Sequence, residues 1–250
     1  MQKTQSKIGS ALFSFFIFII AIPFMGANLK PAANSAPASP ISTSLNPDSV
    51  TNPVFKKMTM YEGMELESFG LSKKAFEYAM KGYDYLLKSG KLTKKDIITV
   101  IDFSKPSTEK RLYVLDVENL KVLYQTYVSH GRNSGKLYAT KFSNKPESNM
   151  SSLGAYITGN TYFGEHGYSL RLNGEERGIN DNAYRRAIVI HSADYASERF
   201  IDSQGFLGRS FGCPALPREV AKPVIETIKD GSCIFVYAPS KTYEVKSKIL

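Results

Sequence analysis

Two residues of this chain have the types and the spacing for nucleophilic chemistry. Cys213 lies in the segment GRSFGCPAL, residues 208–216, where Gly212 permits a sharp bend immediately before the thiol. His191 ends the apolar run IVIH, which is typical of a strand. A thiol becomes a useful nucleophile when a neighbouring group accepts its proton, and imidazole is the usual acceptor in proteins. The pair predicts a catalytic cysteine at position 213 with His191 as its base.

Attack of a thiolate on an amide produces a tetrahedral oxyanion, which backbone N–H groups stabilise. We expect these groups to come from Phe211, Gly212 or Cys213 in the loop that carries the thiol. The thioester formed by the attack then passes its acyl group to an amine, giving a cross-link, or to water, giving a trimmed peptide. The sequence therefore predicts an acyltransferase or a peptidase.

The second cysteine, Cys233, opens an alternative for Cys213. An exported protein with two cysteines commonly joins them in a disulfide. Cys233, however, lies in the apolar run CIFVY, where a thiol behaves as a small buried hydrophobe. Cys213 has polar, glycine-containing surroundings instead. These contexts favour one nucleophile and one core cysteine over a disulfide.

The other two histidines have weaker signals. His166, in the segment FGEHG, is expected either to line the substrate cleft or to belong to a surface loop, and His130 is most simply a turn residue. A zinc metallopeptidase is a further alternative, with ligands drawn from Glu165, His166, His191 and Asp194. No His-x-x-x-His pattern supports it, and it leaves the Gly212–Cys213 loop without a role. We expect neither a metal nor an organic cofactor.

The elements that position these residues are mainly strands. Apolar or alternating runs predict a hairpin from 111–116 and 122–128, with further strands at 97–103, 154–158, 168–172, 187–190 and 233–237. One helix is expected at 218–229, before Gly231 and interrupted by Pro223. Residues 94–250 are therefore predicted to form a mainly β, sandwich-like catalytic domain. Residues 54–93, with apolar residues at helical spacing, predict a small helical segment that precedes it.

The N-terminal region predicts export. Lys3 and Lys7 precede an uncharged apolar run over residues 8–29, so residues 1–27 are expected to be a cleaved signal peptide or a retained membrane anchor. Residues 28–53, rich in Pro, Ala, Ser and Asn, predict a disordered linker. The net charge of +9 is spread along the chain without any nucleic-acid-binding motif, so we expect no nucleic-acid partner. The expected location is the periplasm or cell envelope.

The strand-end His191–Ser192 pair and the Ser-x-Gly-Cys loop resemble the L,D-transpeptidase catalytic-domain family, the YkuD-like fold of bacterial cell-wall enzymes. Eighteen residues, 192–209, separate His191 from Ser210 of the loop in this chain. The loop is similar to that of the murein L,D-transpeptidase branch, which reads Gly-Arg-Ser-aromatic-Gly-Cys-Pro-Ala. The resemblance covers about residues 95–238. It departs from the broader family at Phe211, where a histidine is usual, and at Pro214, where an arginine or asparagine is usual.

The resemblance implies a function and roles for individual residues. Cys213 is the implied nucleophile, His191 the base, and Ser192 the residue whose carbonyl orients the imidazole. The implied substrate is a peptidoglycan stem tetrapeptide, cut at the L-centre carbonyl of its diamino acid and transferred to the side-chain amine of another stem. Residues implied as substrate-binding are Ser210, Arg209 and His166, and Arg209 is equally expected to be a solvated loop charge.

Two other functions stay open at this level. An L,D-carboxypeptidase would hydrolyse the same thioester, because the choice between amine and water depends on the shape of the acceptor site. A wall-binding module would keep the fold without turnover, and the departures at Phe211 and Pro214 favour it. The three functions predict different products from the same tetrapeptide.

Overall fold

The structure, a computed structural model, describes residues 53–250. The predicted signal peptide or anchor at 1–27, with its apolar run 8–29, and nearly all of the predicted linker at 28–53 lie outside the described residues. Within the part of the chain that the structure describes, no helix has both the length and the apolar character to cross a bilayer.

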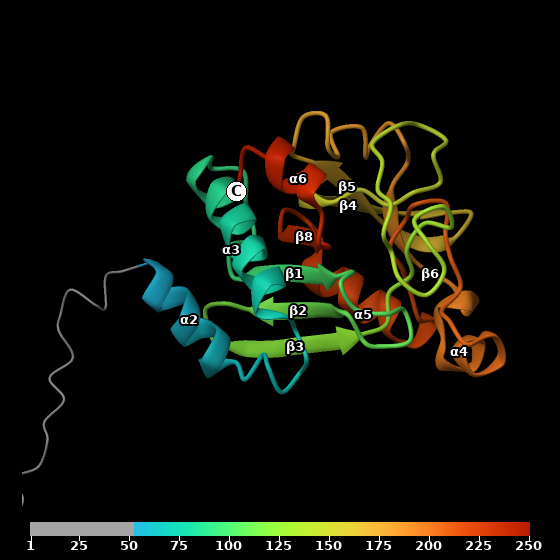
Figure 1. Ribbon diagram of the computed structural model, residues 1–250, viewed down its shortest axis with the longest axis horizontal. Helices are drawn as coiled ribbons and strands as arrows, with labels where there is room; N and C mark the ends of the chain where they lie inside the picture. The colour runs from blue at the N-terminus through green and yellow to red at the C-terminus, as the bar shows by residue number, and fades with distance from the viewer. Residues whose placement is uncertain (1–52) are drawn as a thin grey trace, which may run out of the picture. The chain divides into compact units, whose positions relative to one another are not determined.

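A single mixed sheet forms the centre of the domain (Figure 1). Its strands, in chain order, are β1 (Ile97–Asp102), β2 (Leu112–Asp116), β3 (Lys121–Thr126), β4 (Gly154–Gly164), β5 (Gly167–Gly174), β6 (Val189–Ser192), β7 (Ala215–Leu216) and β8 (Cys233–Tyr237). Their spatial order is β3-β2-β1-β8-β4-β5-β6-β7. The β1–β8 and β6–β7 pairs are parallel and the others antiparallel. The predicted mainly β fold class is confirmed.

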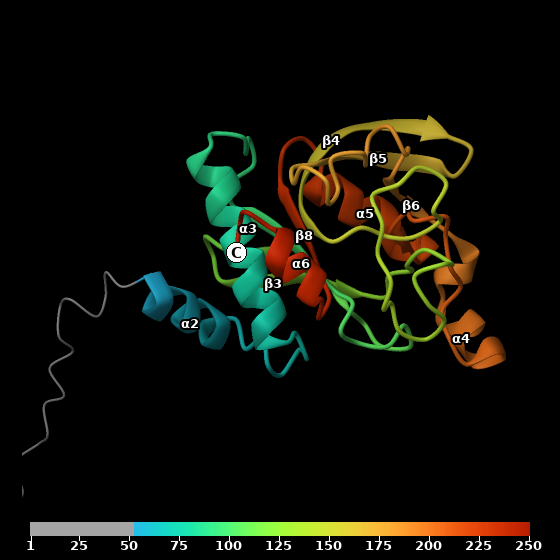
Figure 2. The same cartoon turned by 45° about the horizontal axis from the view of Figure 1, so that its top comes forward.

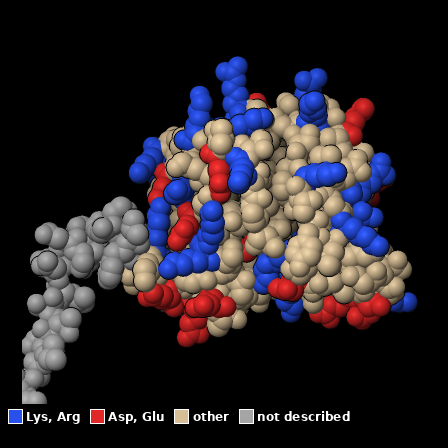
Figure 3. Space-filling model, in the orientation of Figure 1, with Lys and Arg blue, Asp and Glu red and all other residues tan. Residues whose placement is uncertain are grey.

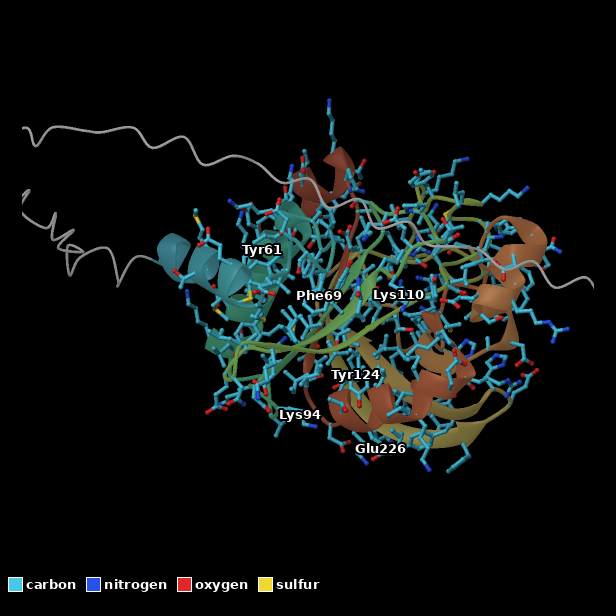
Figure 4. All side chains as sticks on the ribbon, turned by 90° about the horizontal axis from the view of Figure 1, so that it is seen from below. Tyr61, Phe69, Lys94, Lys110, Tyr124 and Glu226 are labelled. Carbon is cyan, nitrogen blue, oxygen red and sulfur yellow. The ribbon has the colours of Figure 1, made fainter. Side chains whose placement is uncertain are left out.

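The two central strands explain why the sequence forms this sheet. All six residues of β1 and all five of β8 are buried, as expected of continuous apolar runs covered on both faces. Helix α3 (Lys73–Lys88) packs against β8 so closely that a β-carbon on Gly82 would lie 2.6 Å from the Phe235 ring. Helix α5 (Arg218–Ile228) contacts β1, β5 and β6. Figures 2 and 4 show α3 and α5 on different sides of the strands.

The helical part before the sheet consists of α2 (Pro53–Gly63) and α3. Ser72 caps α3 by accepting a hydrogen bond from the Ala75 N–H. The hydroxyl of Tyr61, labelled in Figure 4, donates to the Leu71 carbonyl at 2.6 Å and joins the end of α2 to the start of α3. These helices belong to the same hydrophobic core as the sheet.

The C-terminal half contains the predicted helix and two shorter ones. Helix α5 accommodates Pro223 and buries its apolar face. The Lys94 ammonium donates to the Thr227 carbonyl at 2.9 Å, and Figure 4 shows Lys94 on the same side as Glu226 of α5. Beyond the prediction, the structure adds α4 (Glu198–Gln204) and α6 (Lys241–Lys246), both capped by serines. Each is too short to leave a clear periodic pattern.

Basic side chains are dispersed over the described surface. Figure 3 shows Lys and Arg scattered across the visible face, interleaved with Asp and Glu. No single stripe of positive charge stands out on that face.

Candidate active site

The loop that carries Cys213 is closed by one serine side chain. The Ser210 hydroxyl donates to the Cys213 carbonyl at 2.6 Å and accepts from the Gly212 N–H at 3.0 Å. Ser210 is itself buried. The Ser210 hydroxyl thus braces the loop, and the expectation that Ser210 also binds substrate stays a prediction.

Gly212 is required by both the conformation and the packing of this loop. Its φ of +129° is one that residues with a β-carbon rarely adopt. A β-carbon there would also lie 2.8 Å from the Met150 carbonyl oxygen. The bend before the thiol thus brings the loop backbone directly against the segment around Met150.

Strand pairing places Cys213 beside the strand that carries His191. β6 and β7 are parallel, with His191 opposite Ala215, and Cys213 precedes Ala215 by two residues, as Val189 precedes His191. The Val189 N–H donates to the Cys213 sulfur at 3.5 Å, and the thiol donates to the Ala187 carbonyl at 3.7 Å. Two residues of a strand span about 6.6 Å, so His191 lies about that far along β6 from Val189, whose N–H contacts the sulfur. Among the described residues, no hydrogen bond joins the Cys213 thiol to the imidazole.

His191 has the tautomer and the charge state of a base. It is buried, and its Nδ1 lies 2.9 Å from the Ser192 carbonyl, which only accepts, so Nδ1 carries the proton and Nε2 keeps its lone pair. Burial lowers the pKa of His191 below its ordinary value, the Ser192 carbonyl acts in the opposite direction, and nearby His166 lowers it further. The imidazole is therefore neutral at neutral pH.

The two cysteines are both free thiols, so the disulfide alternative is wrong. Cys233 lies in β8 and is fully buried, as predicted for a core cysteine. Cys213 is partly accessible. Burial raises the pKa of the Cys213 thiol, whereas the Val189 N–H and the charge of Arg186 lower it.

The backbone donors near the sulfur differ in whether they are already hydrogen-bonded. The Gly212 N–H is engaged by Ser210. In the described part of the chain, the N–H groups of Phe211 and Cys213 make no hydrogen bond. The Phe211 and Cys213 N–H groups are therefore the available donors in this geometry, and an oxyanion role for Gly212 stays a prediction.

His166 lies at the tip of the β4–β5 hairpin and stacks on the ring of His191. The two ring centroids are 4.4 Å apart and the ring planes differ by 23°. His166 is exposed, and a cavity of about 470 Å³ opens beside the pair. This cavity, here called the His191 cavity, is lined by Glu165, His166, Gly167, Tyr168, His191, Ser192, Ala193, Asp194, Tyr195 and Arg218. Cys213 is not among its lining residues.

Arg209 and Phe211 are exposed residues of the loop that carries Cys213. Arg209 is exposed, but its guanidinium donates to the carbonyls of Arg132 and Gly135 at 3.3 and 3.2 Å. Phe211 is 65% exposed, with the Arg132 guanidinium 4.6 Å from its ring centroid. Arg209 is thus a loop contact rather than a freely solvated charge, and its guanidinium retains unused N–H groups.

The residues of the zinc alternative do not form a metal centre. Over residues 53–250, no group of three or more His, Cys, Asp and Glu side chains is arranged to hold a metal ion. Asp194 forms an ion pair with Arg218 instead, in which both carboxylate oxygens accept from the guanidinium. The arrangement of donors therefore does not support the metallopeptidase reading.

Two residues near the sulfur were not foreseen. Arg186 precedes β6, and its charge acts on Cys213. Tyr195 lines the His191 cavity, and burial together with the nearby Cys213 raises its pKa to about 12. Neither belongs to a recognisable pattern in the sequence, because both are brought to the site by turns on either side of β6.

Comparisons with known proteins were made for the whole chain. No curated protein matches it. Of the solved structures, 36 chains match. L,D-transpeptidases from Mycobacterium smegmatis and Mycobacterium tuberculosis H37Rv are 16% and 15% identical, with TM-scores of 0.37 each, over 57% of this chain. The helical cell shape determining protein Pgp2 from Campylobacter jejuni is 15% identical over 65% of this chain, with a TM-score of 0.39.

These structural matches extend over 59%, 58% and 57% of the respective solved chains, so less than two thirds of each is spanned. The family comparison is more extensive. The family model described as the L,D-transpeptidase catalytic domain matches residues 67–237, which include the whole sheet, His191 and the Cys213 loop. By that match over more than half of its length, the chain belongs to the L,D-transpeptidase catalytic-domain family.

Proposed function

We propose that this chain is a cysteine L,D-transpeptidase that acts on peptidoglycan stem peptides. The observation that carries the proposal is the parallel pairing of β6 with β7, since it brings the Cys213 loop beside the strand that contains His191. Export of the chain and residence in the cell envelope belong to the same proposal, because the substrate lies there. No metal or organic cofactor is needed for the steps below.

Acylation begins with transfer of the Cys213 proton to Nε2 of His191. The thiolate attacks the L-centre carbonyl carbon of the donor's diamino acid, and the oxyanion accepts hydrogen bonds from the free Phe211 and Cys213 N–H groups. The C–N bond then breaks, and the imidazolium returns its proton to the departing amine of the terminal D-residue. The product is a thioester on Cys213.

Proton transfer needs a closer approach of sulfur and imidazole than the substrate-free structure has. The resting thiol is held by Val189 and Ala187 at 3.5 and 3.7 Å, distances typical of weak sulfur hydrogen bonds. Such contacts are easily exchanged, and catalytic hydrogen bonds commonly tighten only when substrate binds. Binding of the donor is therefore part of the proposed activation.

The His191 cavity supports an amine as the acceptor. It adjoins the base but not the nucleophile, so a group that enters it reaches His191 first. Its lining carries the carboxylates of Glu165 and Asp194 and the guanidinium of Arg218, the last two paired with each other. Carboxylates suit an ammonium group and a guanidinium suits a carboxylate. The acceptor stem, whose diamino acid carries both, matches this lining, which favours transpeptidation over hydrolysis.

The test is incubation of the full chain with a disaccharide tetrapeptide, followed by mass spectrometry of products and protein. We expect cross-linked dimers and a thioester adduct on Cys213, both lost in Cys213→Ala and both kept in the matched core variant Cys233→Ala. Trimmed tripeptides without dimers would identify an L,D-carboxypeptidase. Binding to sacculi with no adduct and no product would identify a wall-binding module. Unchanged turnover in Cys213→Ala would overturn the proposal.

A further inference from the structure

The side chain of Arg186 binds one distant segment of the chain almost exclusively. Its guanidinium is partly buried and lies in the turn before β6, five residues ahead of His191. All its hydrogen bonds go to residues 143–152, which here are called the clamp segment. The acceptors are the Ser143 carbonyl at 2.8 Å, the Ser152 hydroxyl at 3.3 Å, the Ser148 hydroxyl at 3.4 Å and the Met150 carbonyl at 2.5 Å.

The same guanidinium lies against the residue that precedes the nucleophile. Nη2 of Arg186 is 3.2 Å from the position that a β-carbon of Gly212 would occupy. The Met150 carbonyl oxygen, which Nη2 binds, is 2.8 Å from that position. Arg186 and Met150 thus form the surface on which the Gly212–Cys213 bend rests.

Ala187, the residue after Arg186, accepts the hydrogen bond of the Cys213 thiol from a strained backbone conformation. Ala187 has a φ of +53°, a left-handed conformation that is unfavourable for residues with a β-carbon. Its carbonyl oxygen is the acceptor of the Cys213 thiol. Strained residues of this kind persist where surrounding contacts hold them, and they gather at functional sites. The four hydrogen bonds of Arg186 supply such contacts one residue away.

The positive charge of Arg186 also acts on the Cys213 sulfur. The charge of Arg186 lowers the pKa of the Cys213 thiol, and Cys213 in turn raises the pKa of Arg186 and of Tyr195. Tyr195, with its pKa raised to about 12, is a neutral phenol at neutral pH. A guanidinium keeps its charge under all ordinary conditions and is only weakly hydrated, which suits a partly buried position beside an anion.

We propose that Arg186 is a positioning residue with an electrostatic effect: it fixes the Gly212–Cys213 bend through the clamp segment and holds its positive charge beside the sulfur in the thiolate state. The proposal rests on the proposed function of Cys213 as nucleophile. The positive charge of Arg186 stabilises the Cys213 thiolate, and it thereby lowers the free-energy cost of transferring the thiol proton to His191.

The experiment is alkylation of Cys213 by iodoacetamide as a function of pH, in the full chain, with the modified residue identified by mass spectrometry. Arg186→Gln removes the charge, Arg186→Lys keeps it, and the neighbouring exposed Arg185→Gln is the matched control. Loss of the charge is expected to move the inflection of the rate to higher pH by about one unit, which lowers the alkylation rate at pH 7 about tenfold. Arg186→Lys is expected to stay close to the unaltered protein, as is Arg185→Gln.

Two results would overturn the inference. One is an unchanged inflection in Arg186→Gln, and the other is a shift in Arg186→Lys as large as in Arg186→Gln, which would leave the charge without effect. Thermal unfolding of each variant shows whether the fold is kept, and the lysine variant keeps the comparison informative if the glutamine variant unfolds. Turnover of Cys213→Ala separately tests the nucleophile, so failure of the inference and failure of the proposed function are distinguishable.

Discussion

The ring of His166 stacks on the ring of His191, with centroids 4.4 Å apart and planes at 23°. Both rings line the His191 cavity, and the contact covers one face of the His191 ring. It also places a second titratable ring beside the first, and that ring lowers the pKa of His191 in addition to the effect of burial. A base with a lowered pKa stays unprotonated, and so active, to lower pH.

Removal of His166 should therefore move the acidic limb of the pH–rate profile to higher pH. His166→Ala takes away the neighbouring charge and admits water to His191, and both changes raise the pKa of that base. His166→Phe keeps the stacking and removes only the charge, so its shift should be smaller. Profiles of kcat/KM against pH check this, and a shift of the acidic limb to lower pH in His166→Ala would contradict it.

The bracing role of Ser210 predicts a loss in rate rather than in binding. Ser210→Ala removes two hydrogen bonds that close the nucleophile loop, each worth about 0.5–1.5 kcal/mol. We expect thioester formation to slow about tenfold or more, with little change in KM for the tetrapeptide. Ser210→Thr, which keeps the hydroxyl, is the matched control. A raised KM with an unchanged acylation rate would instead support the expectation of a substrate contact.

A β-carbon at Gly212 should be far more harmful than one at a comparable open glycine. Gly212→Ala meets both a φ of +129° and the Met150 carbonyl, so a loss of about 1–3 kcal/mol in unfolding free energy and most of the activity is expected. Gly205, with a φ of +75°, has no atom within 4 Å of such a β-carbon. Gly205→Ala is expected to cost about 1 kcal/mol without affecting turnover. Thermal unfolding and product formation measure both, and equal effects at the two sites would argue against the packing explanation.

A substitution of Asp194, which lines the His191 cavity, should change how the thioester is resolved. Asp194→Asn weakens the attraction for the acceptor's ammonium group and releases Arg218 from its ion pair. Acylation of Cys213 should proceed at the same rate, whereas the ratio of cross-linked to hydrolysed product should fall. The exposed Asp202→Asn is the control. Mass spectrometry of the products gives the ratio, and an unaltered ratio would remove Asp194 from acceptor binding.

Local sequence patterns predicted the parts of this molecule that depend on local chemistry. The apolar runs that form β1 and β8 are recognisable because both faces of these strands are buried. Cys233 could be placed in the core by the same argument. The family resemblance, resting on the His191 and Cys213 motifs, is confirmed by the family comparison.

Contacts between distant segments could not be predicted in this way. Ser210 has the same polar character whether it binds a ligand or its own loop, and only the backbone conformation decides which. Gly212 was expected to offer its N–H, but that group turns inward toward Ser210. Arg186 finds its partners 34–43 residues earlier in the chain, in the clamp segment, which carries no strand or helix of its own.

Because β6 and β7 pair over only two residues each, insertions should be tolerated differently inside these strands and in the connection between them. A shift of one residue within either strand would turn its side chains to the opposite face of the sheet. Insertions inside 188–192 or 213–216 should therefore separate thiol from imidazole. In the connection between them, residues 207–212 are held by their own contacts, whereas α4 has no buried residue. Loop length there is free to vary, and this makes α4 a natural place for grafting a peptide tag or for diversifying the enzyme.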